Sequence, residues 1–233
     1  MNIAFIPARS GSKGIPMKNL KTVNGESLLS RTIRAAIQSK KIDHIYVSSD
    51  SEEILSHAFN HGAKCIKRSE LLSQDQTSSE AVLIDALSEV ENNKIDISII
   101  VLLQCTSTFT SPEEIDTVVS ELEKNKGIHD SAFAASTSHS FLWNYNKEQR
   151  KASGINHQFN MKRKRRQELD STQYLELGSV YAVEKNSLLS TNSRFGNNPL
   201  PVALSSLNSF LEIDTFEDLK IANIIASNYS NNE

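Results

Sequence analysis

A short run near the start of the chain, "PARSGSKGIPMKN" at residues 7–19, combines the residue types that hold a polyphosphate. Its glycines, Gly11 and Gly14, let the backbone approach a ligand closely or adopt a positive φ. Successive N–H groups in such a turn form a concavity that binds anions. The run also carries basic and hydroxyl side chains, which add charge and hydrogen-bond donors: Arg9, Lys13, Lys18, Ser10 and Ser12. A triphosphate would satisfy all of these groups.

This glycine–lysine run (residues 7–19) matches neither of the two common glycine-rich phosphate motifs. It lacks the G-x-x-x-x-G-K-[ST] pattern of P-loops and the G-x-G-x-x-G pattern of dinucleotide-binding proteins. A solvated basic turn is the alternative interpretation. Pro7, Gly14 and Pro16 favour a defined turn instead, because each restricts or directs the backbone.

Short β-branched runs alternate along the chain with segments of helical periodicity. The expected strands lie at residues 3–6, 44–49, 65–68, 97–104, 131–135 and 179–183, and the expected helices at 28–39, 52–61, 79–92, 112–126 and 215–227. Alternation of this kind predicts βαβ units and a largely parallel sheet. The glycine–lysine run then follows the first strand, at the carboxyl edge where open α/β sheets bind ligands. We also expect Asp50, after the second strand, to cap the next helix.

Composition sets limits on the partners. The chain has 233 residues, a formal net charge of −3 and 23% charged residues, so nothing predicts a general attraction to nucleic acid or to anionic lipid. The longest apolar run, residues 97–103, is too short to span a membrane. The two cysteines, Cys65 and Cys105, are expected to be free thiols in a reducing compartment. We therefore expect a cytoplasmic protein with no membrane or nucleic-acid partner.

Residues 138–173 interrupt the alternation. This segment is polar, has scattered aromatic residues and contains "MKRKRRQ" at 161–167. A segment of this length is too small to fold alone, so we expect an insertion that packs against a second copy of the chain in a homodimer. The rest, 1–137 and 174–233, would form the core. For the basic stretch, a solvated face is favoured over nucleic-acid binding or an import signal.

The glycine–lysine run resembles the signature of the sialic-acid-type cytidylyltransferases, the CMP-acylneuraminate synthetases. Further similar segments follow in the family's order: "IYVSSDSEEI" (45–54), "KRSELLSQDQTSSEAVLIDAL" (67–87), "LLQCTSTF" (102–109), "RRQEL" (165–169), "GSVYAV" (178–183) and "EIDTFEDLKIA" (212–222). The resemblance implies a three-layer, mostly parallel, Rossmann-like nucleotidyltransferase sheet. It also implies a reaction that joins CTP to a nine-carbon 2-keto sugar acid and releases pyrophosphate.

The resemblance also implies roles for individual residues. The nucleotide would be held by Arg9, Ser12, Lys13, Lys18, Asn19, Arg68 and either Ser78 or Ser79. The sugar acid would meet Gln104, Arg166 and Gln167, the last two reaching it from a neighbouring subunit. Mg²⁺ would be held by Asp214 and Glu212, whose spacing points both to one face if they lie on a strand. The resemblance implies three catalytic residues, Lys13, Lys18 and Asp214. The two lysines, and the Mg²⁺ that Asp214 would hold, are cations that offset the repulsion between CTP and an acidic substrate.

The chain departs from the family pattern near the expected sugar site. Glu212 stands where aspartate is usual, Leu177 where asparagine is usual, and "TSTFT" (106–110) where the family has "TSPLR". The identity of the sugar acid therefore stays open between N-acetylneuraminic, deaminated and legionaminic types, with the eight-carbon Kdo and pseudaminic types less favoured. A non-catalytic protein that binds a nucleotide or nucleotide sugar on the same fold is the alternative function.

Overall fold

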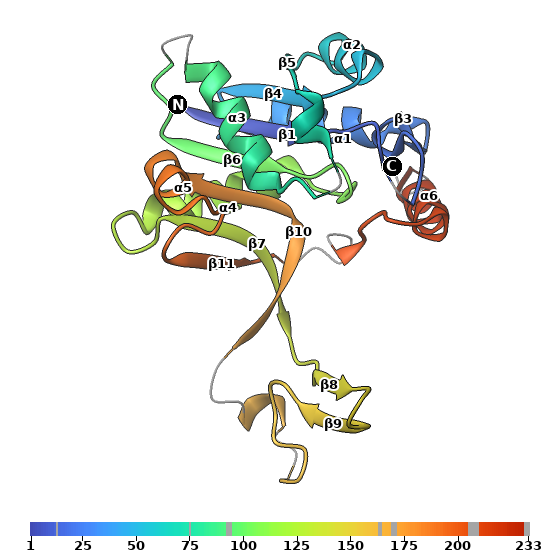
Figure 1. Cartoon of the computed structure of the whole chain (residues 1–233), viewed down its shortest axis with the longest axis vertical. Helices are drawn as coiled ribbons and strands as arrows, with labels where there is room; N and C mark the ends of the chain where they lie inside the picture. Colours follow the sequence, from blue (N-terminus) through green and yellow to red (C-terminus); the bar gives the residue numbers. More distant parts are fainter. Residues whose placement is uncertain are drawn as a thin grey trace.

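A seven-stranded sheet forms the centre of the molecule (Figure 1). The computed structural model describes residues 1–12, 14–74, 76–91, 95–162, 165–168, 172–204 and 210–230. The strands are β1 (Asn2–Pro7), β4 (His44–Ser49), β5 (Lys64–Lys67), β6 (Ile99–Leu103), β7 (Ser131–Ser138), β10 (Gln173–Glu184) and β11 (Pro199–Ala203), in the order β11-β7-β10-β6-β1-β4-β5. Only β10 runs antiparallel to its neighbours, β6 and β7. The predicted mostly parallel sheet is confirmed.

Helices cover both faces of the sheet. The helices α1 (Leu28–Gln38), α2 (Glu52–Asn60), α4 (Pro112–Lys124) and α6 (Phe216–Ser230) pack on one face, and α3 (Ser79–Glu91) and α5 (Lys185–Thr191) on the other. In strand β1, side chains on both faces of the sheet are buried, which explains why the strands are continuous apolar runs in the sequence. Ala4 and Ile6 enter the first core, whereas Ile3 and Phe5 enter the second. The expected three-layer α/β architecture is therefore confirmed.

The helices begin at residues that suit an N-cap. Ser27, Ser51 and Ser111 accept hydrogen bonds from the first turns of α1, α2 and α4, and Ser111 forms a capping box with Glu114. The expected cap at Asp50 is thus wrong, because the next residue, Ser51, takes that place. The predicted helix starts and ends lie within a few residues of those observed, as expected for helix termini that fray.

Smaller elements complete the body. After the glycine–lysine run come the 3-10 helix η1 (Lys18–Leu20) and a short hairpin of β2 (Thr22–Val23) and β3 (Glu26–Ser27), and η2 (Glu70–Ser73) precedes α3. Residues 211–214 have no regular secondary structure, so the expectation that Glu212 and Asp214 lie on a strand is wrong. None of the described helices is long and apolar enough to cross a membrane.

Residues 138–173 form an arm that leaves the body between β7 and β10. The two strands stay paired beyond the sheet, with Ser138 opposite Gln173, and lead to a hairpin of β8 (Trp143–Asn146) and β9 (Lys151–Gly154). The 3-10 helix η3 (Arg166–Glu168) also belongs to the arm. Figure 1 shows the arm extending away from the body, with the hairpin at its far end.

Candidate functional site

Two adjoining cavities open at the carboxyl edge of the sheet. The loop cavity, of about 360 Å³, is lined by Pro7, Arg9, Ser12, Gly14, Lys18, Asn19 and Asp214. The strand-end cavity, of about 270 Å³, is lined by Pro7, Arg9, Asn19, Arg68, Leu72, Gln74, Thr77, Ser79, Val82, Gln104, Cys105 and Thr106. Three residues line both cavities, so the two cavities lie next to each other.

Asp50 holds the start of the glycine–lysine run against the end of β4. One carboxylate oxygen accepts from Ser10 N (2.9 Å) and the other from Ser10 Oγ (2.7 Å). Burial alone would raise the pKa of Asp50, but the two hydrogen bonds from Ser10, with a smaller effect from the charge of Arg68, bring it below its usual value. Asp50 is therefore a carboxylate that anchors the run, a role that sequence reasoning missed because Ser10 is 40 residues away.

The far side of the run packs against the closing segment (residues 211–215). Gly14 lies so close to the backbone carbonyl of Asp214 that a Cβ at this position would overlap it. Lys18 Nζ forms an ion pair of 2.9 Å with Asp214 Oδ1, and the side chains are 14% and 68% exposed, respectively. The lysine is thus held at the floor of the loop cavity, while the aspartate remains open to a ligand.

Asn19 closes the run on itself. Its side chain, in a residue that is 7% exposed, donates from Nδ2 to the carbonyl oxygen of Arg9 at 3.0 Å. This bond joins the two ends of the run. Arg9 and Asn19, which both line the loop cavity, are therefore held next to each other.

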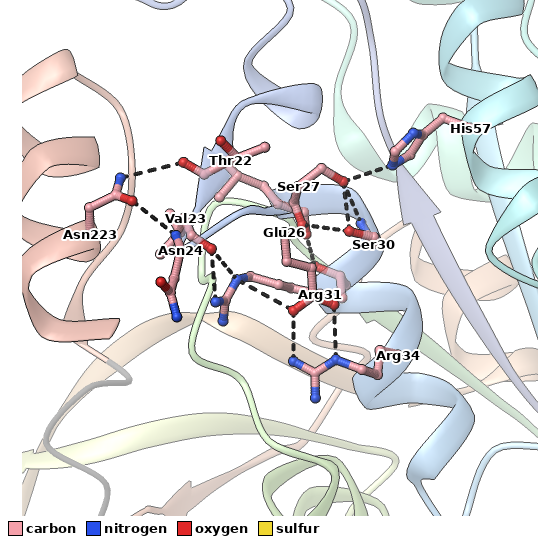
Figure 2. Close-up of polar contacts among 12 residues, drawn as sticks. Thr22, Val23, Asn24, Glu26, Ser27, Ser30, Arg31, Arg34, His57 and Asn223 are labelled. Atoms are coloured by element: carbon pink, nitrogen blue, oxygen red, sulfur yellow. Dashed lines mark hydrogen bonds and ion pairs between the residues drawn. The ribbon is translucent and has the colours of Figure 1, made fainter. Parts of the chain in front are cut away.

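The β2–β3 hairpin ties the run to α1 and α6 (Figure 2). Arg31, on α1, donates from Nε (3.2 Å) and Nη2 (2.9 Å) to the carbonyl oxygen of Val23. Asn223, on α6, accepts from Asn24 N at 2.9 Å and donates to the carbonyl oxygen of Thr22 at 3.4 Å. The hairpin that follows Lys18 is thereby attached to the helix that follows Asp214, which keeps the two residues together.

Arg68 and Gln104 reach the strand-end cavity from β5 and β6. Arg68 is 4% exposed and donates from Nη2 to the carbonyl oxygen of Ser48 (2.7 Å) and from Nε to Ser48 Oγ (3.3 Å). Burial lowers the pKa of Arg68, and the charge of Asp50 partly offsets this effect. The arginine keeps its charge because its ordinary pKa lies so far above neutrality.

Of the two candidate serines, Ser79 lines the strand-end cavity. Ser78 is exposed, and its hydroxyl accepts from Ala81 N at 3.1 Å at the start of α3, as an N-cap does. Ser79 is therefore the better placed of the two for contact with a nucleotide.

The two carboxylates expected to bind Mg²⁺ contact different parts of the molecule. Asp214 lines the loop cavity, but the Glu212 carboxylate lies against Gly178, where an added Cβ would overlap it. Within the described part of the chain, no group of three or more His, Cys, Asp or Glu side chains could hold a metal ion. The two residues therefore do not form the shared carboxylate face that their spacing suggested.

A sequence model of the cytidylyltransferase family matches residues 3–222. The chain belongs to the cytidylyltransferase family. It is 31% identical over 223 residues to the CMP-N,N'-diacetyllegionaminic acid synthase of Legionella pneumophila subsp. pneumophila, covering 91% of this chain and 90% of that protein. It is also 39% identical over 140 residues to N-acylneuraminate cytidylyltransferase A of Danio rerio, which covers 60% of this chain. The chain spans only 31% of the length of that relative.

A solved structure shares the fold of this chain at low sequence identity. A CMP:2-keto-3-deoxy-manno-octonic acid synthetase, solved with CTP bound, superposes with a TM-score of 0.68 at 18% identity, covering 97% of this chain and 99% of that one. The agreement extends over nearly the whole of both chains and shows that the sheet and its helices are those of that fold.

Four residues singled out in the sequence analysis are not among those that line the two cavities as described. Lys13 is outside the described residues. Arg166 and Gln167 belong to η3 in the arm, which leaves the body between β7 and β10. Leu177 is 3% exposed and packs in the core on the α1 side, so the side chain that replaces the usual asparagine does not face the site.

Proposed function

We propose that this cytidylyltransferase transfers CMP from CTP to a nine-carbon, sialic-acid-like 2-keto sugar acid and releases pyrophosphate. The observation that carries the proposal is the loop cavity, where the anchored run brings Arg9, Ser12 and Lys18 together opposite Asp214. Its polar and basic lining suits a triphosphate. The named activities of the relatives from Legionella and Danio support the nine-carbon class of acceptor.

The two cavities divide the substrates between them. The triphosphate of CTP lies in the loop cavity against Arg9 and Lys18, and the nucleoside extends toward Arg68 and Ser79 in the strand-end cavity. The sugar acid enters beside Gln104. Its anomeric hydroxyl attacks the α-phosphorus in line, and pyrophosphate leaves with its charge stabilised by the lysine. The protein contributes placement and electrostatics, which nucleotidyl transfer chiefly requires.

Asp214 is the residue that would hold Mg²⁺. Its exposed carboxylate stands at the loop cavity, and Mg²⁺ in nucleotide sites is commonly held by one or two carboxylates together with substrate phosphates and water. The ion would neutralise phosphate oxygens as charge develops on pyrophosphate. Glu212, turned toward Gly178, is the weaker candidate as a ligand.

The arm is proposed to join two copies of the chain. Large apolar side chains on the arm are more than half exposed: Leu142, Trp143, Tyr145, Ile155, Phe159 and Met161. An exposed apolar cluster on so small a projection is covered most simply by the same cluster of a second copy. In such a homodimer, η3 would bring Arg166 and Gln167 to the sugar acid of the neighbouring subunit.

The test is pyrophosphate release from CTP and Mg²⁺ with a panel of N-acetylneuraminic, deaminated neuraminic, legionaminic, pseudaminic and Kdo acids. We expect release with at least one nine-carbon acid. Asp214→Asn should lower the rate by about 100-fold, because it removes the carboxylate that would hold Mg²⁺ beside the phosphates. The matched control is Glu217→Gln, an exposed carboxylate on the first turn of α6.

Two results would contradict the proposal. Release with Kdo alone would move the acceptor to the eight-carbon class. CTP binding without release for every acid would favour a non-catalytic nucleotide-binding protein.

A further inference from the structure

Arg194, in the loop between α5 and β11, connects three elements around Gln104. Its Nε forms an ion pair of 2.5 Å with Glu80 Oε1 on the first turn of α3. Its guanidinium carbon lies 4.9 Å from the centroid of the Tyr181 ring on β10. Its Nη1 lies 3.2 Å from the side-chain amide of Gln104 at the end of β6. One side chain thus contacts an acid, an aromatic ring and an amide.

The guanidinium of Arg194 is rigidly held. Its side chain is 15% exposed and that of Glu80 20% exposed. Burial would raise the pKa of Glu80, but the hydrogen bond and charge of Arg194 lower it below its usual value, so Glu80 is a carboxylate at neutral pH.

The ring of Tyr181, which Arg194 contacts, is also held in place by its neighbours. The Tyr181 hydroxyl donates to Glu176 Oε1 at 2.5 Å, and the ring meets Phe195 edge-on at 5.7 Å between centroids. Because Phe195 follows Arg194 directly in the chain, its packing also restrains the backbone that carries the arginine. The guanidinium plane therefore has little freedom to turn.

These contacts determine which way the amide of Gln104 faces. The two end atoms of the amide lie 3.1 Å from the carbonyl oxygen of Gly178 and 3.2 Å from Arg194 Nη1. Both contacts are hydrogen bonds only when the nitrogen faces Gly178 and the oxygen faces Arg194, and the amide is assigned in that orientation. The reverse orientation would set oxygen against the Gly178 carbonyl and the NH₂ group against the guanidinium, and neither pair can form a hydrogen bond. Arg194 and Gly178 together thus allow one orientation.

We propose that Arg194 is a positioning residue, which orients Gln104 so that its second N–H donates to an oxygen of the sugar acid. This inference rests on the proposed function. Among the described residues that line the strand-end cavity, Gln104 is present and Arg194 is not, so the arginine acts through the amide. A fixed N–H group can pair only with a hydrogen-bond acceptor. The group recognised on the sugar acid is therefore a carboxylate, carbonyl or hydroxyl oxygen.

The first experiment measures KM for each substrate in Arg194→Met, which removes the donor and keeps a long side chain. We expect the KM for the sugar acid to rise about tenfold, the effect of one lost hydrogen bond of about 1.4 kcal/mol, with the KM for CTP nearly unchanged. Arg194→Lys keeps the charge beside Glu80 and should recover part of the loss. The control is Arg34→Met. It removes an arginine of α1 that forms an ion pair with Glu26 on β3.

Two further variants separate positioning from folding. Glu80→Gln combined with Arg194→Met leaves no unpaired half-buried carboxylate, and it should fold and still show the raised sugar-acid KM. On a Gln104→Ala background, Arg194→Met should change this KM by less than about twofold, because the arginine no longer has an amide to orient. The full tenfold effect on that background, or an equal rise in both KM values, would overturn the inference. If none of the tested sugar acids supported pyrophosphate release by the wild-type protein, the proposed function itself would fail.

Discussion

At the residue scale, a few long-range polar contacts turn a basic loop into a binding site. Asp50, which follows β4, accepts two hydrogen bonds from Ser10, and Asp214, in the closing segment, forms an ion pair with Lys18. The glycine–lysine run is therefore held by one contact near each of its ends. Preorganisation of this kind lowers the entropic cost of ordering the loop when the ligand binds. In the proposed function the anchors would therefore contribute to CTP binding, although Asp50 is not among the residues that line the loop cavity.

Asp50→Ala should weaken CTP binding. The substitution removes both acceptors for Ser10, and we expect the KM for CTP to rise about tenfold while the KM for the sugar acid changes little. Steady-state kinetics with each substrate varied in turn would measure this. The control is Glu52→Ala, which removes a carboxylate that is 81% exposed and two residues away. A KM for CTP equal to that of the control would contradict the assigned role.

At the element scale, the start of α1 is linked to α2 through Ser27 and His57. Ser27 Oγ caps α1 by accepting from Ser30 N at 3.0 Å, and it lies 2.8 Å from His57 Nε2 (Figure 2). Burial, and next the charge of nearby His61, lower the pKa of His57, with Glu53 opposing the shift. Neutral imidazole can accept the Ser27 hydroxyl proton at Nε2, whereas imidazolium cannot.

This link predicts a loss of stability in mild acid. Because the folded-state pKa of His57 lies below its unfolded value near 6.5, the unfolded chain binds more protons as the pH falls through about 6.5. The free energy of unfolding should therefore be highest above that pH and decrease below it. Urea denaturation between pH 8 and 5, in steps of about half a unit, should show a smaller decrease for His57→Gln. Parallel curves for the two proteins would refute the prediction.

At the scale of the whole molecule, the body and the arm have different surfaces. The body encloses two cores on either side of its sheet, whereas the arm carries its large apolar side chains at the surface. On the arm, Trp143 contacts the His157 ring edge-on at 4.7 Å and Phe159 at 5.4 Å between centroids, which forms a local cluster without a buried centre. Such a cluster gains most of its stability when a second copy covers it.

Charges on the arm should therefore separate the proposed dimer. The variant Trp143→Lys/Phe159→Lys should sediment as a single chain, while the wild-type protein sediments at twice that mass. Activity should fall with it, because Arg166 and Gln167 would no longer reach the neighbouring site. The control is Phe59→Lys, an aromatic residue of α2 that is 72% exposed on the body. A wild-type protein that sediments as a monomer would rule out this role for the arm.

Local patterns in the sequence determined much of the architecture. The alternation of β-branched runs with helical segments specified a layered sheet, because both periodicities are set by neighbouring residues. The position of the glycine–lysine run after β1 followed from the same reasoning. The antiparallel direction of β10 was not predicted, since strand direction depends on which partners a strand finds in three dimensions.

Only the tertiary structure decided how the site residues pair. Asp50 reads locally as a helix cap, but folding places it against Ser10, 40 residues earlier. Glu212 and Asp214 read as a pair, but without a strand to align them they turn toward different neighbours. Arg194 has no sequence motif, and it matters because folding brings it to Gln104. Spacing fixes side-chain direction only within a regular element, whereas contacts between distant segments depend on how those elements pack.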